Sequence, residues 1–316
     1  MRYIKTADER EISAVALGCM RIADMTMHEV DTFVHTALDA GINFVDEADI
    51  YGKGKSEEIL GRLLTQQRNL RDRLFIQSKC AIHDGMFDFS KEYILQAVDG
   101  ILSRLRTDHL DSLLLHRPDA LMEPSEVAEA FDQLQKSGKV LSFGVSNQGP
   151  MQMAYLESGL HQKLWTNQVQ LSCAHTVMLD AGFNVDMHND AGILRDGGIL
   201  PYCQIHDMVI QAWSPLQMGY FEGVFLQSEK YAALNAELTN IGAKYGIGPD
   251  TVAYAWILRI PAKMQVILGT TRPERVETAA RAADICLTRE EWYSIYRAAG
   301  NLLPPNLQSK CNASQK

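Results

Sequence analysis

The sequence predicts an α/β fold, a (β/α)8 TIM-type barrel with an N-terminal β-hairpin and additional C-terminal helices, built as a single domain over residues 1–316. Short apolar runs alternate with segments whose apolar residues recur at helical spacing. Eight such runs can be counted, and eight strand–helix units close most naturally into a barrel. A doubly wound open sheet is the competing architecture, but no GxGxxG motif follows an early apolar run.

Polar residues at 6–10 interrupt the β-forming residues of 2–13, which predicts a hairpin ahead of the barrel. The predicted barrel strands are 14–20, 43–45, 74–79, 112–116, 140–145, 166–171, 208–212 and 265–269, and Asp46 lies at the C-terminal tip of the second. The predicted helices are 27–38, 56–65, 91–105, 125–137, one from 150, 199–207, 229–245, 249–260 and one from 274. Residues 174–198 are polar and glycine-rich, and predict a long loop over one face.

Two helix starts carry recognisable capping residues. Thr26 and Glu29 have the spacing of a capping box, and Gly41 is placed to end the helix that follows. Ser90 is placed to cap a long helix with one apolar face. These signals mark both ends of the helix before the second predicted strand and the start of the helix after the third.

Composition narrows the class of protein. A net charge of -9 and a pI near 5.5 argue against a nucleic-acid partner, which requires clustered Lys and Arg. No run approaches the roughly 20 apolar residues of a membrane span, and the charged N-terminus does not resemble a signal peptide. We therefore expect a cytoplasmic enzyme with no membrane association.

The cysteines favour free thiols. They form no CxxC pair, so reduced side chains are expected rather than a disulfide framework or a metal site. The Asn312–Ser314 sequon is a glycosylation signal in pattern alone. The six cysteines are Cys19, Cys80, Cys173, Cys203, Cys286 and Cys311.

Polar or titratable residues follow the predicted strands at their C-terminal ends. Each alone has an ordinary structural explanation as a turn residue, a solvated lysine or a structural histidine. Active sites of this fold, however, lie at the C-terminal ends of the strands. The number of polar residues gathered on that one face is larger than turn residues alone would explain. The residues are Asp46 with Tyr51 in the following loop, Lys79, His116, Ser146, Asn147, Gln168, Gln170, Ser214, Thr270 and Thr271.

Seven motifs carry a resemblance to a known family. In order along the chain they are NFVDEADIYG, FIQSK, LLLHRPD, FGVSN, NQVQ, AWSPL and VILGTTRPER, the last ending at residue 275. Together they resemble the aldo-keto reductase family, and its bacterial oxidoreductase branch more than its steroid-metabolising branch. The resemblance implies a catalytic tetrad of Asp46, Tyr51, Lys79 and His116. It also implies NADPH (NADP+), with no metal, bound across the barrel mouth without a Rossmann fold.

The chemistry of carbonyl reduction explains these four residue types. A hydride must reach carbon and a proton must reach oxygen, so the site needs an acid that stays protonated at neutral pH. Tyr51 would be that acid, Lys79 would favour its phenolate, and Asp46 would hold and balance Lys79. His116 would orient the carbonyl oxygen.

The resemblance also assigns the cofactor site. Ser146, Asn147 and Gln168 would bind the nicotinamide carboxamide, and Trp213 would stack on the ring. Ser214 and Leu216 would approach the pyrophosphate. The full set assigned to cofactor binding is Met20, Arg21, Asp46, Ser146, Asn147, Gln168, Trp213, Ser214, Leu216, Gly269, Thr270, Thr271 and Arg275, the last four around the adenosine 2′-phosphate.

Several positions depart from the family pattern. Thr278 and Ala279 stand where Glu-Asn often holds the adenine, which leaves the adenine contacts open. Glu47 replaces a frequent Thr, and Gln170 replaces a frequent Glu. These departures affect local hydrogen bonding and leave the tetrad intact.

Two other functions remain open from the residues alone. Lys79 beside Tyr51 and Asp46 could serve a Schiff-base aldolase, and the barrel could be an NADPH-binding regulatory module with little turnover. The expected partner is a small-molecule carbonyl substrate, and the chain is compatible with a monomer or a weak homo-oligomer. Substrate specificity would come from segments 20–21, 82–89, 175–196 and 218–227 and from the C-terminal tail.

Overall fold

The computed structural model describes residues 1–6, 9–220 and 222–304. Eight parallel strands form a closed barrel in which each strand pairs with its neighbours in chain order, and the last pairs with the first. This confirms the predicted (β/α)8 fold. The barrel strands are β3 (Val15–Gly18), β4 (Phe44–Asp46), β5 (Phe75–Cys80), β8 (Ser112–Leu115), β9 (Phe143–Ser146), β10 (Leu164–Gln170), β11 (Val209–Trp213) and β12 (Lys263–Leu268).

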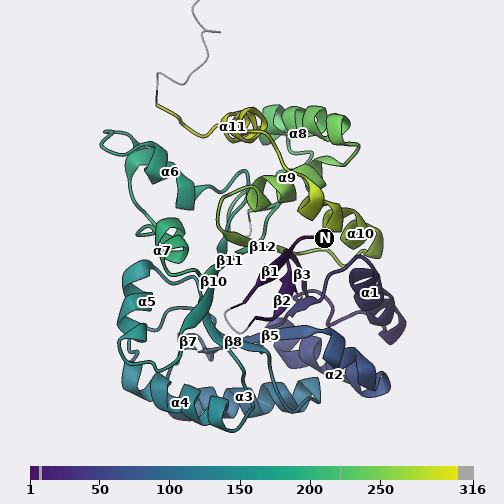
Figure 1. The fold of residues 1–316 in the computed structure, drawn as a ribbon, viewed down its shortest axis with the longest axis vertical. Coiled ribbons are helices and arrows are strands. Elements are labelled where there is room, and N and C mark those ends of the chain that lie inside the picture. The colour runs from purple at the N-terminus through teal and green to yellow at the C-terminus, as the bar shows by residue number, and fades with distance from the viewer. Residues whose placement is uncertain (7–8, 221, 305–316) are drawn as a thin grey trace, which may run out of the picture.

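Helices surround the strands on the outside (Figure 1). They are α1 (Met27–Asp39), α2 (Lys55–Gln66), α3 (Lys91–Leu105), α4 (Pro124–Lys136), α5 (Pro150–Glu157), α6 (Val177–Phe183), α7 (Ile199–Ile205), α8 (Ala232–Tyr245), α9 (Pro249–Leu258), α10 (Pro273–Ala280) and α11 (Arg289–Ala298). The predicted capping box of Thr26 and Glu29 is present at α1, and the Ser90 hydroxyl accepts from the Tyr93 backbone at α3. The additional C-terminal helix α11 packs against α8.

The predicted N-terminal hairpin consists of β1 (Tyr3–Lys5) and β2 (Glu11–Ser13), paired antiparallel, while residues 7 and 8 of its turn lie outside the described residues. A second hairpin, which is not among the predicted elements, joins β6 (Ile82–His83) to β7 (Met86–Phe87). Asp84 and Gly85 between them have φ of 48° and 79°, the left-handed conformation that two-residue hairpin turns require. The Asp84-Gly85 dipeptide is the sequence feature from which this hairpin could have been predicted.

The prediction of a long loop over residues 174–198 was wrong in part, because α6 and a 3₁₀ turn at Asp190–Gly192 lie within it. Met178 and Leu179 of α6 are buried. The Tyr296 hydroxyl on α11 donates a 2.7 Å hydrogen bond to Asp180 of α6. The C-terminal helix therefore provides the packing partner that makes this polar segment helical, and local composition does not contain that information.

No helix within the described ranges is long and apolar enough to cross a membrane. The cysteines described, Cys19, Cys80, Cys173, Cys203 and Cys286, are free thiols. Cys311, the Asn312–Ser314 sequon and the end of the C-terminal tail lie outside the described residues.

Candidate active site

A cavity of about 950 Å³ lies at the C-terminal ends of the barrel strands. It brings together almost every residue that sequence analysis assigned to catalysis or to the cofactor. Those on its wall are Met20, Arg21, Asp46, Tyr51, His116, Ser146, Asn147, Gln168, Trp213, Ser214, Leu216, Gly269, Thr270, Thr271 and Arg275. Lys79 is the exception, because its side chain is fully buried behind Tyr51.

Lys79 connects the polar residues at the base of this cavity. Its Nζ lies 2.8 Å from the Asp46 carboxylate, donates to the Glu47 backbone carbonyl at 2.8 Å, and donates to the Tyr51 hydroxyl at 3.2 Å. Strands β4 and β5 are adjacent, so Asp46 and Lys79 come from neighbouring strand ends. The Tyr51 ring meets the His116 ring edge-on, with ring centroids 6.2 Å apart. The four predicted catalytic residues therefore form one contiguous cluster.

The ionisation of this cluster follows from its burial. Burial raises the pKa of Tyr51 to about 12, and the Lys79 ammonium offsets that rise only in part. Burial, together with the positive charges of Lys79 and Arg117, holds the pKa of His116 well below its usual value. Burial disfavours the charged form of Lys79 as well, but the attraction of Asp46 outweighs it and the pKa of Lys79 is raised. At neutral pH the cluster thus holds a phenol, a neutral imidazole and an ammonium.

Glutamine side chains fill the barrel interior beneath Asp46. Gln77 and Gln168 donate to Oδ1 of Asp46 at 2.7 and 2.9 Å, and both also donate to the side-chain oxygen of Gln211. Gln211 in turn donates to Gln77 and to Gln265, and Gln265 donates to the Ser13 carbonyl. All four glutamines are buried. The carboxylate of Asp46 is therefore held by amides that are themselves fixed.

The wall assigned to the nicotinamide is internally hydrogen-bonded. Asn147, whose φ is 58°, donates to the His116 carbonyl and to the Ser146 hydroxyl and accepts from the Trp213 indole. The Ser146 hydroxyl donates to the Gln168 carbonyl, and both amide hydrogens of Gln168 are engaged as described above. These side chains consequently offer oxygen acceptors to a bound group, which suits the NH2 end of a carboxamide.

The opposite end of the cavity is cationic. Arg272 and Arg275, at and just inside the start of α10, border it, and their guanidinium groups have no hydrogen-bond or ion-pair partner among the described residues. Arg21 donates to the Gly269 carbonyl. The Thr270 hydroxyl accepts from the Arg272 backbone N–H. Unpaired guanidinium groups beside a helix start are suited to a phosphate group.

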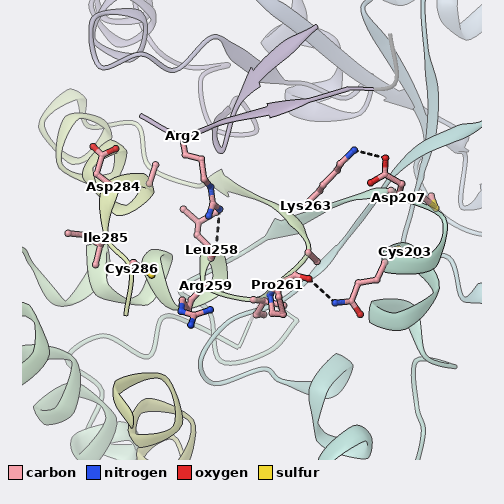
Figure 2. Close-up of a pocket in the computed structure, with 15 residues that line it drawn as sticks. Arg2, Cys203, Asp207, Leu258, Arg259, Pro261, Lys263, Asp284, Ile285 and Cys286 are labelled. Atoms are coloured by element: carbon pink, nitrogen blue, oxygen red, sulfur yellow. Dashed lines mark hydrogen bonds and ion pairs between the residues drawn. The ribbon is translucent and has the colours of Figure 1, made fainter. Parts of the chain in front are cut away.

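A second cavity, of about 650 Å³, lies where β11 and β12 begin, at the other end of the barrel (Figure 2). Its polar side chains are already paired within the protein. Lys263 forms a 2.7 Å ion pair with Asp207, and Arg2 donates to the Leu258 carbonyl. None of the predicted site residues borders it. No group of three or more His, Cys, Asp or Glu in the described part of the chain is arranged to hold a metal ion.

The family model described as "Aldo/keto reductase family" matches residues 14–299, which span every barrel strand and the whole cavity wall. The chain belongs to the aldo/keto reductase family. It is accordingly an NAD(P)H-dependent oxidoreductase.

Individual relatives match over almost their whole length. The 6-dehydroglucose reductase of Agrobacterium fabrum (strain C58 / ATCC 33970) is 35% identical over 312 residues, 95% of this chain and 98% of the relative. Oxidoreductase YdhF of Escherichia coli (strain K12) is 36% identical, over 92% of this chain and 94% of the relative. The crystal structure of an aldo/keto reductase from Klebsiella pneumoniae in complex with NADP and acetate is 26% identical, with a TM-score of 0.74 and 96% of each chain covered.

The cavity of this aldo/keto reductase also contains residues that sequence analysis did not select. Arg117, Gln217, Asn235, Asp250, Tyr254 and Arg272 all border it, beside Tyr220 of the predicted specificity segment 218–227. Two of these residues could have been selected from the sequence, because Arg117 directly follows His116 and Arg272 lies inside the GTTRPER motif. Residues such as Asn235 and Asp250 lie on helices α8 and α9, where the spacing of residues does not show that they face the cavity.

The positions that depart from the family pattern lie away from the cavity. Glu47 is fully buried and accepts from the Ser56 hydroxyl. Thr278 is exposed, Ala279 is buried, and neither borders the cavity. No residue of segment 175–196 borders the cavity either, and its contribution to substrate specificity stays a prediction.

Proposed function

We propose that this protein reduces aldehyde or ketone carbonyl groups to alcohols with NADPH, and that Tyr51 donates the proton. The observation that carries the proposal is the Lys79 ammonium, which contacts both the Asp46 carboxylate and the Tyr51 hydroxyl behind the cavity wall. The reductase names of the relatives and the NADP-bound Klebsiella pneumoniae structure are consistent with it. Carbonyl reduction in general follows from family membership.

Tyr51 is suited to act as the acid. With a pKa raised to about 12 by burial it stays protonated at neutral pH, and an alkoxide forming on the substrate is a stronger base than phenolate. As the proton leaves, the phenolate gains the attraction of Lys79, 3.2 Å away. Asp46 fixes the position of Lys79 and neutralises it before the reaction begins.

His116 is suited to orient the substrate. Its imidazole borders the cavity and is neutral. A neutral imidazole carries one N–H, which can be donated to the carbonyl oxygen without adding a second cation beside Lys79. The oxygen would then be held between an N–H donor and the Tyr51 hydroxyl.

NADPH supplies the hydride to the carbonyl carbon when it is bound. The residues that would hold it are the Trp213 ring, the acceptor oxygens of Asn147 and Gln168, and the guanidinium groups of Arg272 and Arg275. The cationic end favours the 2′-phosphate of NADPH over the hydroxyl of NADH. One hydride to carbon and one proton from Tyr51 to oxygen complete the alcohol.

The Schiff-base aldolase alternative is less well supported. Such an enzyme needs a neutral amine with a free lone pair. Lys79 has a raised pKa, is 0% exposed, and donates hydrogen bonds to Asp46, the Glu47 carbonyl and Tyr51. No observation favours a purely regulatory module.

The test measures oxidation of NADPH in the presence of 4-nitrobenzaldehyde, by the loss of its absorbance, and identifies the alcohol product. Wild-type protein should turn over, and Lys79→Met should lose most of the activity while keeping its fold by circular dichroism. Sodium borohydride added with the aldehyde should leave Lys79 unmodified by mass spectrometry. Trapping of the aldehyde on Lys79, or the absence of turnover with NADPH, would reject the proposal.

A further inference from the structure

Arg117 occupies a distinctive place on the wall of the active-site cavity. It follows His116 at the end of β8 and borders the same cavity as Tyr51. Its guanidinium carbon lies 5.9 Å from the ring centroid of Trp213 and 5.5 Å from that of Tyr220. The two rings meet edge to face at 6.1 Å. Arg117 is thus held beside two aromatic side chains at the catalytic end of the cavity.

The charge of Arg117 is not balanced locally. It forms cation–π contacts but no hydrogen bond or ion pair within residues 1–6, 9–220 and 222–304. A guanidinium group carries five N–H donors. Arg117 also lies close enough to His116 to contribute to the low pKa of that imidazole, after burial and Lys79. A half-buried cation therefore stands next to the residue that would orient the carbonyl.

The carboxylates that border the cavity do not compensate this charge. Asp46 is paired with Lys79. Asp250 accepts from the Thr251 backbone N–H at the start of α9, and both Asp250 and Arg275 act electrostatically on Tyr254, which places this acid toward the cationic end of the cavity. The donors of Arg117 are consequently available to a group that enters beside His116.

We propose that Arg117 binds a carboxylate carried by the carbonyl substrate, so that this enzyme prefers oxo acids and aldehyde acids to neutral carbonyl compounds. This inference rests on the proposed function. A guanidinium group matches a carboxylate with two parallel N–H bonds, and a hydrogen bond between charged groups is stronger than one between neutral groups. The rings of Trp213 and Tyr220 hold the guanidinium by its cation–π contacts, which use none of its N–H donors in hydrogen bonds.

The experiment compares acids with their neutral isosteres. The ratio of kcat/KM for 3- and 4-carboxybenzaldehyde to that for the corresponding methyl esters is measured at saturating NADPH in wild type, Arg117→Met and Arg117→Lys. Wild type should prefer at least one acid to its ester by about ten- to a hundred-fold. Arg117→Met should abolish that preference through a higher KM for the acid, and Arg117→Lys should keep part of it. The ester should change by no more than about threefold in kcat/KM.

Arg275→Met is the matched control, because it removes a cation from the far end of the same cavity. At saturating NADPH its acid-to-ester ratio should equal that of wild type. The preference of wild type for the acid should also weaken as the salt concentration rises, and this can be measured on the wild-type protein alone. Equal loss of acid and ester turnover in Arg117→Met, or a wild type that prefers every ester, overturns the carboxylate assignment while leaving the reductase function standing. Absence of turnover of both acids and esters would overturn the function as well.

Discussion

Gln168 donates a 2.9 Å hydrogen bond from its side-chain amide to Oδ1 of Asp46, and it does so from inside the barrel. The interior of such barrels is usually filled by branched apolar side chains. Here glutamines occupy it, and because their amides bond to one another they avoid the cost of unpaired buried polar groups. The same network positions the carboxylate that balances Lys79.

Gln77→Met should lower kcat for aldehyde reduction by about tenfold or more, since it removes the 2.7 Å hydrogen bond to Asp46 and allows the carboxylate and Lys79 to shift. It should also lower the free energy of unfolding by about 1 to 3 kcal/mol, because Gln211 loses partners. Steady-state kinetics and urea unfolding give the two quantities.

Gln265→Met provides the control for that variant. Gln265 belongs to the same network but makes no contact with Asp46. Its replacement should cost similar stability and change kcat by about twofold at most. If both variants lose kcat to the same extent, the glutamines have a structural role only.

Tyr51→Phe should lower kcat by a factor of about a hundred or more, the scale of general acid catalysis, because it removes the proposed proton donor. Thermal unfolding and NADPH titration should stay close to wild type, since the aromatic ring remains. The titration can follow tryptophan fluorescence, because Trp213 borders the cavity. Near wild-type turnover in this variant would remove Tyr51 from the mechanism.

Arg275→Ala should weaken NADPH binding by about ten- to a hundred-fold and leave NADH nearly unchanged, because the 2′-phosphate is present in NADPH alone. Arg272→Ala is the informative companion, as its side chain borders the same end of the cavity. Fluorescence titrations with both cofactors measure the difference. Equal weakening of NADH and NADPH in Arg275→Ala would make Arg275 structural.

Asp49→Asn should stabilise the protein at pH 8 by about 1 to 3 kcal/mol. Burial, with the nearby Glu57, raises the pKa of Asp49 from 3.8 to about 7, and its Oδ1 has no partner among the described residues. The folded state therefore binds this proton more tightly than the unfolded state, and stability is lost as pH rises from about 4 to 7. The gain should disappear near pH 4. Denaturant unfolding at pH 8 and at pH 4 measures the gain in stability. An equal gain at both pH values would mean that it comes from packing rather than from ionisation of Asp49.

Several strand ends could be predicted from the sequence because a polar residue terminates an apolar run, as Asp46 and His116 do. A parallel barrel then brings those strand ends to one face, independently of where the helices begin and end. The helix α6 could not be predicted, since its packing partner Tyr296 lies more than a hundred residues away.

The glutamine network was missed although a signal exists. Gln211 and Gln265 interrupt largely apolar strands, and Gln77 begins the polar stretch Gln77–Lys79 of β5. Single polar residues in strands usually face outward, and the sequence does not show that these point to a shared interior. Arg117 was missed for a related reason, because the direction of a side chain after a strand end depends on the loop that follows.

The hydrogen bonds that hold Asp46 and Lys79 come from strand residues, from the Glu47 backbone and from Tyr51, while the described residues of segments 82–89 and 218–227 contribute none of them. Ile82, Tyr220 and Val224 nevertheless border the space a substrate would enter. We therefore expect mutations in these two segments to alter which compound is accepted without disturbing the chemical step. Such a division makes the protein a practical starting point for directed evolution, with libraries confined to the two segments and the barrel interior kept constant.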